Sequence, residues 1–172
     1  MANTGNDVTV IIGGGHAAGA LMTTLLQKNY QQAVALVGEE PHPPYQRPPL
    51  SKTYLAGDVD QESLYMKSRS VFDDAGYQLR LGERAERIDR DNKTITLSDQ
   101  STLKYSQLVL ATGSRVRRLN AQGADLKGLH YLHDMADSDA LREQFVRGKS
   151  LVIVGGGYIG LEVAAIAVKA GL

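Results

Sequence analysis

The stretch TVIIGGGHAAGALMTTLLQKNY (9–30) decides the fold. It holds a short β-branched run, three glycines and then a pattern typical of a helix. Gly13, Gly15 and Ala18 fit the fingerprint G-x-G-x-x-G/A, which joins a strand to a helix in dinucleotide-binding Rossmann folds. The first glycine makes a tight turn, the second lets backbone approach a pyrophosphate, and the third small residue allows close helix–strand packing. The helix then presents free N–H groups and its positive dipole end to phosphates.

A second stretch, LVIVGGGYIGLEVAAIAVKAGL (151–172), repeats this pattern at an offset of 142 residues. Asn29 and Gly171 take equivalent places after the two predicted helices, where left-handed backbone is common. A lone fingerprint is weak evidence, but here the strand–turn–helix context is present twice. The residues of the second fingerprint are Gly155, Gly157 and Gly160.

The first fingerprint is followed by a second predicted strand, AVALVGEE (33–40). Glu39 ends this strand 26 residues past Gly13, slightly beyond the usual spacing of about 20. A carboxylate at this place would accept hydrogen bonds from a ribose. The alternative is a glycine-rich turn without a ligand, but the order of strand, turn, helix, strand and acid favours dinucleotide binding.

The rest of the chain predicts helices and short strands. Alternating segments predict a β-meander, with a hairpin turn at 89–93 between two of its strands. The other predicted elements are a helix over 63–76, a buried strand over 106–114, a helix over 133–148 that begins near Asp137 or Ser138 and ends before Gly148, and a strand over 151–154.

The predicted fold class is therefore α/β. A Rossmann-like dinucleotide-binding domain with a β-meander occupies residues 1–119, residues 120–148 form a connecting segment with a helix, and residues 149–172 begin a second Rossmann domain. Since a Rossmann half needs more strands than 151–154, we expect an N-terminal part of a longer protein. A complete protein with a docked C-terminal helix is the alternative.

Composition excludes several function classes. Nineteen basic residues balance nineteen acidic ones among 172, so overall charge predicts neither a nucleic-acid partner nor a membrane surface. No apolar run approaches the roughly 18 residues that span a membrane, and no signal-peptide pattern is present, which favours a soluble cytoplasmic protein. The absence of cysteine excludes disulfides, thiol catalysis and cysteine-based metal sites, and no metal site is predicted.

All five prolines fall between Pro41 and Pro49, in a run that ends on Lys52. Proline fixes φ and restricts the preceding residue, so this loop is stiff before any ligand binds. The stretches PYQRPPLSKTYLAG and VIVGGGYIGLEVAA together resemble the putidaredoxin reductase-like family, the FAD-dependent NAD(P)H:ferredoxin reductases of cytochrome P450 and Rieske-oxygenase systems. The resemblance covers essentially the whole chain, and it implies that the domain at 1–119 is a Rossmann-like FAD-binding domain and that the domain beginning at 149 binds NAD.

This resemblance implies roles for individual residues. The two implied catalytic residues are Lys52, which would lie beside the flavin ring near N5, and Glu162, which would lie near the nicotinamide within reach of the lysine. The implied FAD contacts are Gly13, Gly15 and Ala17 at the pyrophosphate, Ala18 in the fingerprint, Glu39 at the ribose, Ala85 at the adenine, and Ala111, Thr112 and Gly113 near the cofactor. The implied nicotinamide-nucleotide contacts are Gly155, Gly157, Tyr158, Ile159 and Gly160.

Four of the proposed contact residues carry an alternative. His16, Arg47 and Tyr158 lie at ligand-proximal positions, where turn packing or a structural hydrogen bond explains them equally well. His133 stands where several relatives have arginine. Because histidine titrates near neutrality and lacks the planar fork of arginine, its contact with FAD is an open expectation.

The missing cysteine directs the predicted chemistry. Disulfide reductases of this architecture carry a redox cysteine pair just after the first acidic strand end, where this chain has its prolines. The resemblance therefore implies electron flow from NAD(P)H, with NADH favoured, through FAD to a [2Fe–2S] ferredoxin-type protein. The ammonium of Lys52 would stabilise negative charge on the flavin, whereas an exposed lysine after a loop is the alternative.

Other functions stay open on the sequence alone. A related enzyme could reduce rubredoxin, a quinone or oxygen, and a redox signalling protein like apoptosis-inducing factor shares the fold. Arg115, Arg117 and Arg118 could steer an acidic ferredoxin, but such a run is more often a solvated loop.

Overall fold

The structure is a computed structural model that describes residues 7–172. The chain forms two compact units that interleave along the sequence. The first unit, unit 1, joins the described chain up to Gln46 with Tyr65–Gly113, and unit 2 joins Arg47–Leu64 with Ser114–Leu172. The end of the proline run and the residues after it thus pack with the C-terminal part of the chain. The domain boundaries predicted after residues 119 and 148 stay predictions.

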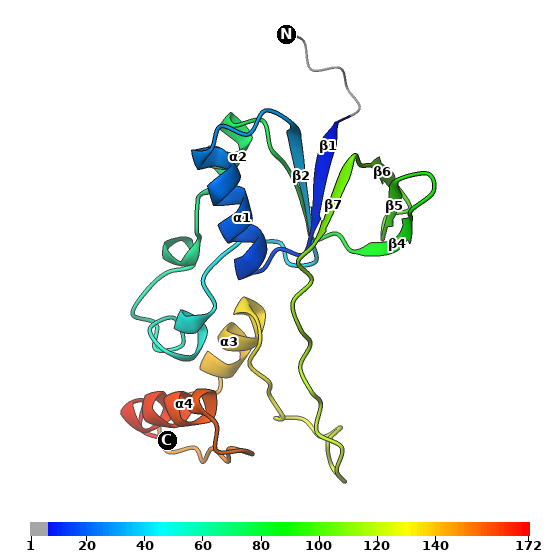
Figure 1. Cartoon of the computed structure of the whole chain (residues 1–172). Helices are drawn as coiled ribbons and strands as arrows, with labels where there is room; N and C mark the ends of the chain where they lie inside the picture. Colours follow the sequence, from blue (N-terminus) through cyan, green and yellow to red (C-terminus); the bar gives the residue numbers. More distant parts are fainter. Residues whose placement is uncertain (1–6) are drawn as a thin grey trace. The chain divides into compact units, whose positions relative to one another are not determined.

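Unit 1 is built on a four-stranded parallel sheet with the order β3-β2-β1-β7 (Figure 1). Two helices belong to the same unit, and α1 follows directly on β1. The first element after the described start is β1, as the fingerprint predicted. The bounds are β1 Val8–Ile12, α1 His16–Gln27, β2 Ala33–Gly38, α2 Arg69–Asp74, β3 Gln78–Leu81 and β7 Gln107–Leu110.

The central strand β1 is buried on both faces, and its side chains alternate between two cores. Ile11 packs with Ala18 and Met22 of α1. Val10 and Ile12 point the other way, toward a core that includes Ile95 and Leu97. Parallel strands covered on both faces read as continuous apolar runs, which is why VTVII and AVALVG lack polar alternation.

The second face is covered by a three-stranded antiparallel sheet of β4 Ala85–Asp89, β5 Thr94–Leu97 and β6 Thr102–Lys104. The predicted hairpin turn is present, with Lys93 at φ +49°. Asp89 fixes this turn, because its carboxylate accepts from the backbone and side-chain nitrogens of Asn92. These hydrogen bonds lower the pKa of Asp89.

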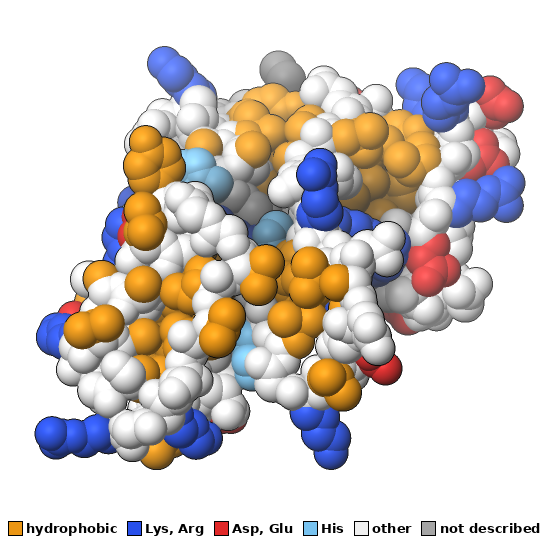
Figure 2. Space-filling view, turned by 90° about the horizontal axis from the view of Figure 1, so that it is seen from below, with side chains coloured by type: hydrophobic (Ala, Val, Ile, Leu, Met, Phe, Trp, Pro, Cys, Tyr) orange, Lys and Arg blue, Asp and Glu red, His pale blue; other side chains and the backbone are white. Residues whose placement is uncertain are grey.

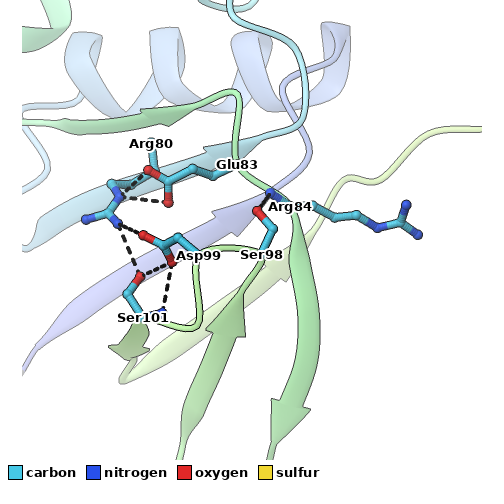
Figure 3. Close-up of polar contacts among 6 residues, drawn as sticks. All are labelled: Arg80, Glu83, Arg84, Ser98, Asp99 and Ser101. Atoms are coloured by element: carbon cyan, nitrogen blue, oxygen red, sulfur yellow. Dashed lines mark hydrogen bonds and ion pairs between the residues drawn. The ribbon is translucent and has the colours of Figure 1, made fainter.

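A polar cluster ties the end of β3 to the turn between β5 and β6 (Figure 3). Arg80 Nε donates to both carboxylate oxygens of Glu83 at 3.0 Å, and its Nη2 lies 3.5 Å from Asp99 Oδ2. Ser101 donates to Asp99 Oδ1, at 2.6 Å from Oγ and 2.9 Å from the backbone N, and these bonds hold the pKa of Asp99 low. The cluster fixes the antiparallel sheet on the parallel one.

Unit 2 has a small core formed by Leu55, Leu141 and Val163. Helix α3 begins with a capping box, in which the Asp134 and Asp137 side chains each accept from the other residue's backbone N–H. Its described elements are the 3-10 turns η1 Pro48–Ser51 and η2 Glu62–Leu64, and the helices α3 Met135–Arg142 and α4 Tyr158–Lys169. No helix in residues 7–172 is long and apolar enough to cross a membrane.

Two predicted helices were too long. The helix predicted over 63–76 is α2 alone, because Tyr65 instead pairs with Tyr45 in an isolated β-bridge. Gly76 still follows it with left-handed backbone. The helix predicted over 133–148 starts after Asp134, earlier than Asp137 or Ser138, and ends at Arg142. Short helices depend on tertiary packing, and pattern alone places their ends poorly.

Two predicted strands also differ from the structure. The strand in 106–114 forms β7, but it lies at a sheet edge and Leu110 is 62% exposed, so it is not buried as predicted. Residues 151–154 belong to no strand, because the described chain offers them no hydrogen-bonding partner.

Hydrophobic side chains gather over much of the face shown in Figure 2.

Candidate functional site

The turn between β1 and α1 has the backbone that the fingerprint predicts. Gly13 adopts φ +105° and its N–H donates to the carbonyl of Val37 at 2.8 Å. A Cβ on Gly13 would lie 2.2 Å from the carbonyl oxygen of Ala111, so no other residue fits. Gly15 is the N-cap of α1, and a Cβ there would meet nothing within 4 Å. The backbone at Gly15 is therefore open to a ligand.

The first turn of α1 suits a pyrophosphate. His16 and Ala17 are exposed there, Ala18 is fully buried against the sheet, and no acidic residue lies in this turn. A helix N-terminus with open backbone N–H groups and no carboxylate attracts anions. These residues fit the pyrophosphate of a dinucleotide, and the contacts predicted for Gly13, Gly15, His16, Ala17 and Ala18 remain predictions.

The other predicted FAD contacts of unit 1 lie beyond the carboxyl ends of β2, β3 and β7. Glu39 directly follows β2, and Ala111–Gly113 directly follow β7, with the Ala111 N–H bonded to the carbonyl of Ile12 at 2.8 Å. Ala85 begins β4, close behind Glu83, whose N–H donates to the carbonyl of Gly38. Ligands of open α/β sheets bind at this edge, so the structure gathers the predicted contacts where such a site belongs.

Arg84 is a neighbour of this edge that the sequence did not single out. Its Nη1 lies 3.5 Å from Glu39 Oε1, and both side chains are exposed. Its backbone is fixed, since its N–H donates to Ser98 Oγ at 3.2 Å and its carbonyl accepts from the Ser98 N–H at 2.8 Å. The cation therefore stands beside the carboxylate predicted to hold the ribose.

Unit 2 brings the two predicted catalytic residues together. Lys52 Nζ lies 2.8 Å from Glu162 Oε1, and Ser51 Oγ donates to Glu162 Oε2 at 2.5 Å. The hydrogen bonds from Lys52 and then Ser51 hold the pKa of Glu162 below its usual range. Two donors on one carboxylate keep it ionised, and the sequence signal for Ser51 was only its place before the lysine.

The proline run builds the turn that presents this pair. Pro48 and Pro49 open η1, and the Lys52 N–H donates to the carbonyl of Pro49 at 2.9 Å. Leu50 is buried, and its carbonyl accepts from Ser138 Oγ of α3 at 2.9 Å. Helices α3 and α4 both contact η1. The stiffness inferred from the prolines thus becomes a turn clamped by two helices.

Tyr54 adds a second anchor after this turn. Its hydroxyl donates to Asp139 Oδ2 at 3.1 Å, and Arg142 lies over its ring with the guanidinium carbon 5.2 Å from the ring centre. Arg142 also donates to the Tyr54 carbonyl. Burial and then the Asp139 hydrogen bond raise the pKa of Tyr54, so it stays a neutral donor.

The Arg47 side chain contacts the backbone of His133. Arg47 Nη1 donates to the His133 carbonyl at 3.0 Å, and the His133 N–H donates to Asp137 Oδ2 at 2.8 Å. His133 is exposed and lines a cavity of about 310 Å³ together with Arg118, His130, Tyr131 and Asp137, among others. The structural hydrogen bond left open for Arg47 is therefore present, while FAD contacts of both residues remain predictions.

The second fingerprint has the turn but not the sheet. Gly155 adopts φ +112°, and Gly157 caps α4 with extended backbone. Tyr158 and Ile159 are exposed in the first turn, and a Cβ on Gly160 would lie 3.1 Å from Ile153 Cγ2. The predicted nicotinamide-nucleotide contacts thus share one turn and one helix start, and their role remains a prediction.

No group of three or more His, Asp or Glu in the described chain could hold a metal ion.

The parallel sheet, the open glycine turn and the second fingerprint define a dinucleotide-binding α/β protein of the two-fingerprint flavoprotein class. The chain belongs to the pyridine nucleotide-disulphide oxidoreductase family, which it matches over residues 7–172. Although the family is named for disulphide chemistry, the 172 residues of this chain contain no cysteine.

The chain is similar to several curated ferredoxin reductases. It is 45% identical to rhodocoxin reductase of Rhodococcus erythropolis over 95% of its own length and 38% of the relative's. It is 41% identical to putidaredoxin reductase of Pseudomonas putida over 97% of its length and 40% of that protein. The crystal structure of a covalent putidaredoxin reductase–putidaredoxin complex matches 97% of the chain and 41% of that chain with a TM-score of 0.90 at 39% identity. The chain thus spans about 40% of these relatives.

Proposed function

We propose that the protein containing this chain is an FAD-dependent NAD(P)H:ferredoxin reductase. It would pass electrons from NAD(P)H through FAD to a small [2Fe–2S] ferredoxin-type protein that feeds an oxygenase. Two relatives, at 40% and 42% identity, are named as the ferredoxin–NAD(+) reductase components of anthranilate and biphenyl dioxygenase systems. Bound FAD would supply a ring that accepts two electrons together and releases them singly.

The observation that carries this proposal is the turn PPLSK and its contact with α4. A cysteine-free, proline-built turn holds Lys52 against Glu162 of the second fingerprint helix at 2.8 Å. An ammonium positioned there would stabilise negative charge on the flavin, and Glu162 would keep it oriented. The proline run holds no thiol at the place where disulfide reductases carry their redox pair, so electrons would not leave the flavin through a thiol of this segment, and an external acceptor is the simplest alternative.

The remaining residues have binding roles in this proposal. The turn at Gly13 and Gly15 with the start of α1 would hold the FAD pyrophosphate, and Glu39 would accept from the adenosine ribose. Ala85 and Ala111–Gly113 would line the adenosine side, with Arg47 and His133 nearer the flavin. The turn at Gly155 and Gly157 with Tyr158, Ile159 and Gly160 would hold the nicotinamide nucleotide, with NADH favoured.

The test uses the purified full-length protein that contains this chain, supplied with FAD. It should show a bound flavin spectrum, lose its visible absorbance on anaerobic addition of NADH, and reduce a [2Fe–2S] ferredoxin at catalytic rates. Failure to bind FAD or to react with either NADH or NADPH would contradict the proposal. A cytoplasmic location is part of the proposal and is tested by cell fractionation.

Rubredoxin is a second candidate acceptor. The chain is 37% identical to rubredoxin-NAD(+) reductase of Pseudomonas putida over 94% of its length and 42% of that protein. Side-by-side turnover with a rubredoxin and a [2Fe–2S] ferredoxin separates the two acceptors. Flavin reduction without turnover of either protein would favour a quinone or oxygen as acceptor, or a redox signalling protein.

A further inference from the structure

Glu162 is held by two donors that differ in mobility. Lys52 and Ser51 are adjacent in the chain, and each contacts a different oxygen of the Glu162 carboxylate, which lies 111 residues beyond Ser51. The side chain of Lys52 is 50% exposed and long, and its Nζ also lies 3.5 Å from the carbonyl of Pro48. Ser51 is only 6% exposed and has a single side-chain torsion to its oxygen.

The surroundings of Ser51 make it the fixed donor of the pair. It is the last residue of η1, directly after the buried Leu50, whose carbonyl is bonded to Ser138 of α3. The Ser51 hydroxyl can move only by rotation about its single side-chain torsion or with this clamped turn, whereas the Lys52 ammonium can swing through several side-chain torsions. The hydrogen bond from Ser51 to a charged acceptor also belongs to the stronger kind.

The geometry points to Ser51 as a positioning residue that keeps the Glu162 carboxylate in place while Lys52 exchanges between Glu162 and the reduced flavin. The exchange with flavin rests on the proposed function, whereas the hold on Glu162 stands on the distances alone. While Lys52 is paired with Glu162, its charge is largely neutralised by the carboxylate. The Lys52 ammonium can stabilise negative charge on the flavin fully only when it moves away from Glu162. The hydrogen bond from Ser51 then ensures that the Glu162 carboxylate still has a donor.

The first fingerprint helix indicates that this grip is not a general property of such helices. The position in α1 equivalent to Glu162 is Ala20, which is exposed and has no charge to hold. The two helices are otherwise of equal length and begin at equivalent glycine caps. The carboxylate and its two donors are thus an addition to the second copy.

The first test measures the hold on Glu162 without any turnover. In protein with ¹³C at the glutamate carboxyl carbons, Glu162 is assigned by comparison with Glu162→Gln and titrated in Lys52→Met and in the double variant Ser51→Ala/Lys52→Met. We expect Lys52→Met to keep the midpoint below the usual value of about 4.3, and the double variant to restore that value. A midpoint already at the usual value in Lys52→Met would overturn the hold by Ser51.

The second test measures the functional part by stopped-flow reduction of the FAD-loaded protein by NADH. Ser51→Ala should slow flavin reduction about 3- to 10-fold, the range of one lost hydrogen bond, and Ser51→Thr should restore most of the rate. Thermal melts of each variant exclude a folding defect. An unchanged rate in Ser51→Ala, in a protein that Lys52→Ala slows, would overturn the functional role. A wild-type flavin that neither NADH nor NADPH reduces would instead refute the proposed function and leave the titration to decide the hold.

Discussion

The two fingerprint turns have the same backbone in different surroundings. Gly13 and Gly155 adopt φ +105° and +112°, and the caps Gly15 and Gly157 are both extended. Yet Val10 is fully buried, while Val152, its equivalent, is 84% exposed. The turn and the helix therefore form in both surroundings, whereas a strand exists only where neighbouring strands supply its hydrogen bonds.

The copies also differ in what they add to the shared turn. The first closes against the carbonyl of Ala111 and faces an edge that gathers Glu39 and the residues after β7. The second contributes Glu162, which the proline-built turn grips through Ser51 and Lys52. One copy is built as a binding edge, and the other also presents a charged pair.

The largest expected effect is on stability, from a substitution that disrupts the first glycine turn, compared with the equivalent substitution in the second turn. Gly13→Ala introduces a Cβ 2.2 Å from the Ala111 carbonyl in left-handed backbone, so we expect a loss of roughly 2–5 kcal/mol in the free energy of unfolding. The matched control, Gly155→Ala, has the same strained φ but nothing within 4 Å, and should lose only about 1–2 kcal/mol. Urea unfolding measures both, and equal losses would contradict the role of the surroundings.

The next prediction concerns the charged pair of the second copy. Lys52→Ala should slow reduction of bound flavin by NADH about 10- to 100-fold while FAD stays bound, because the ammonium that stabilises negative charge is removed. Stopped-flow absorbance measures the rate, and Lys104→Ala on β6 serves as a control for loss of an exposed lysine. A wild-type rate in Lys52→Ala would remove this lysine from the chemistry.

A smaller effect on stability is expected from substitutions at the residues that follow the two fingerprint helices. Asn29 and Gly171 both adopt left-handed backbone, with φ +50° and +88°. Asn29→Gly should change the free energy of unfolding by less than about 1 kcal/mol, since asparagine tolerates this region. Gly171→Ala should lose about 1 kcal/mol, because a Cβ there is strained and lies 2.9 Å from Arg147 Cγ. Chemical denaturation of both variants tests the equivalence, and a larger loss in Asn29→Gly would contradict it.

The smallest expected effect is the pH dependence of the Glu162 contact. Its pKa is lowered in the folded protein, so the contact stabilises the fold above the usual carboxyl pKa of about 4.3 and loses this contribution as the pH falls through the lowered value. Glu162→Gln should therefore be less stable than wild type at pH 7, and the difference should shrink as the pH is lowered below the usual carboxyl pKa. The pair is partly exposed, so the difference at pH 7 is modest and shrinks in high salt. A difference that grew on acidification would contradict this assignment.

The sequence by itself determined the two glycine turns, the helices that follow them and the order of strand, helix and acid in the first copy. These features depend on residues close in the chain: a glycine where φ is positive, an apolar run for a buried strand, and a small residue where the helix meets its strand. It also pointed to Lys52 and Glu162, although only through resemblance.

Only the tertiary structure decided which of these local elements find partners. Residues 151–154 have the apolar pattern of a strand but no neighbour, and β7 became an exposed edge. In the folded chain Tyr65 forms a β-bridge with Tyr45 instead of belonging to a helix, and Ser51 donates a hydrogen bond to Glu162. Ladder hydrogen bonds and contacts between distant residues are set by the whole fold, and no local pattern encodes them.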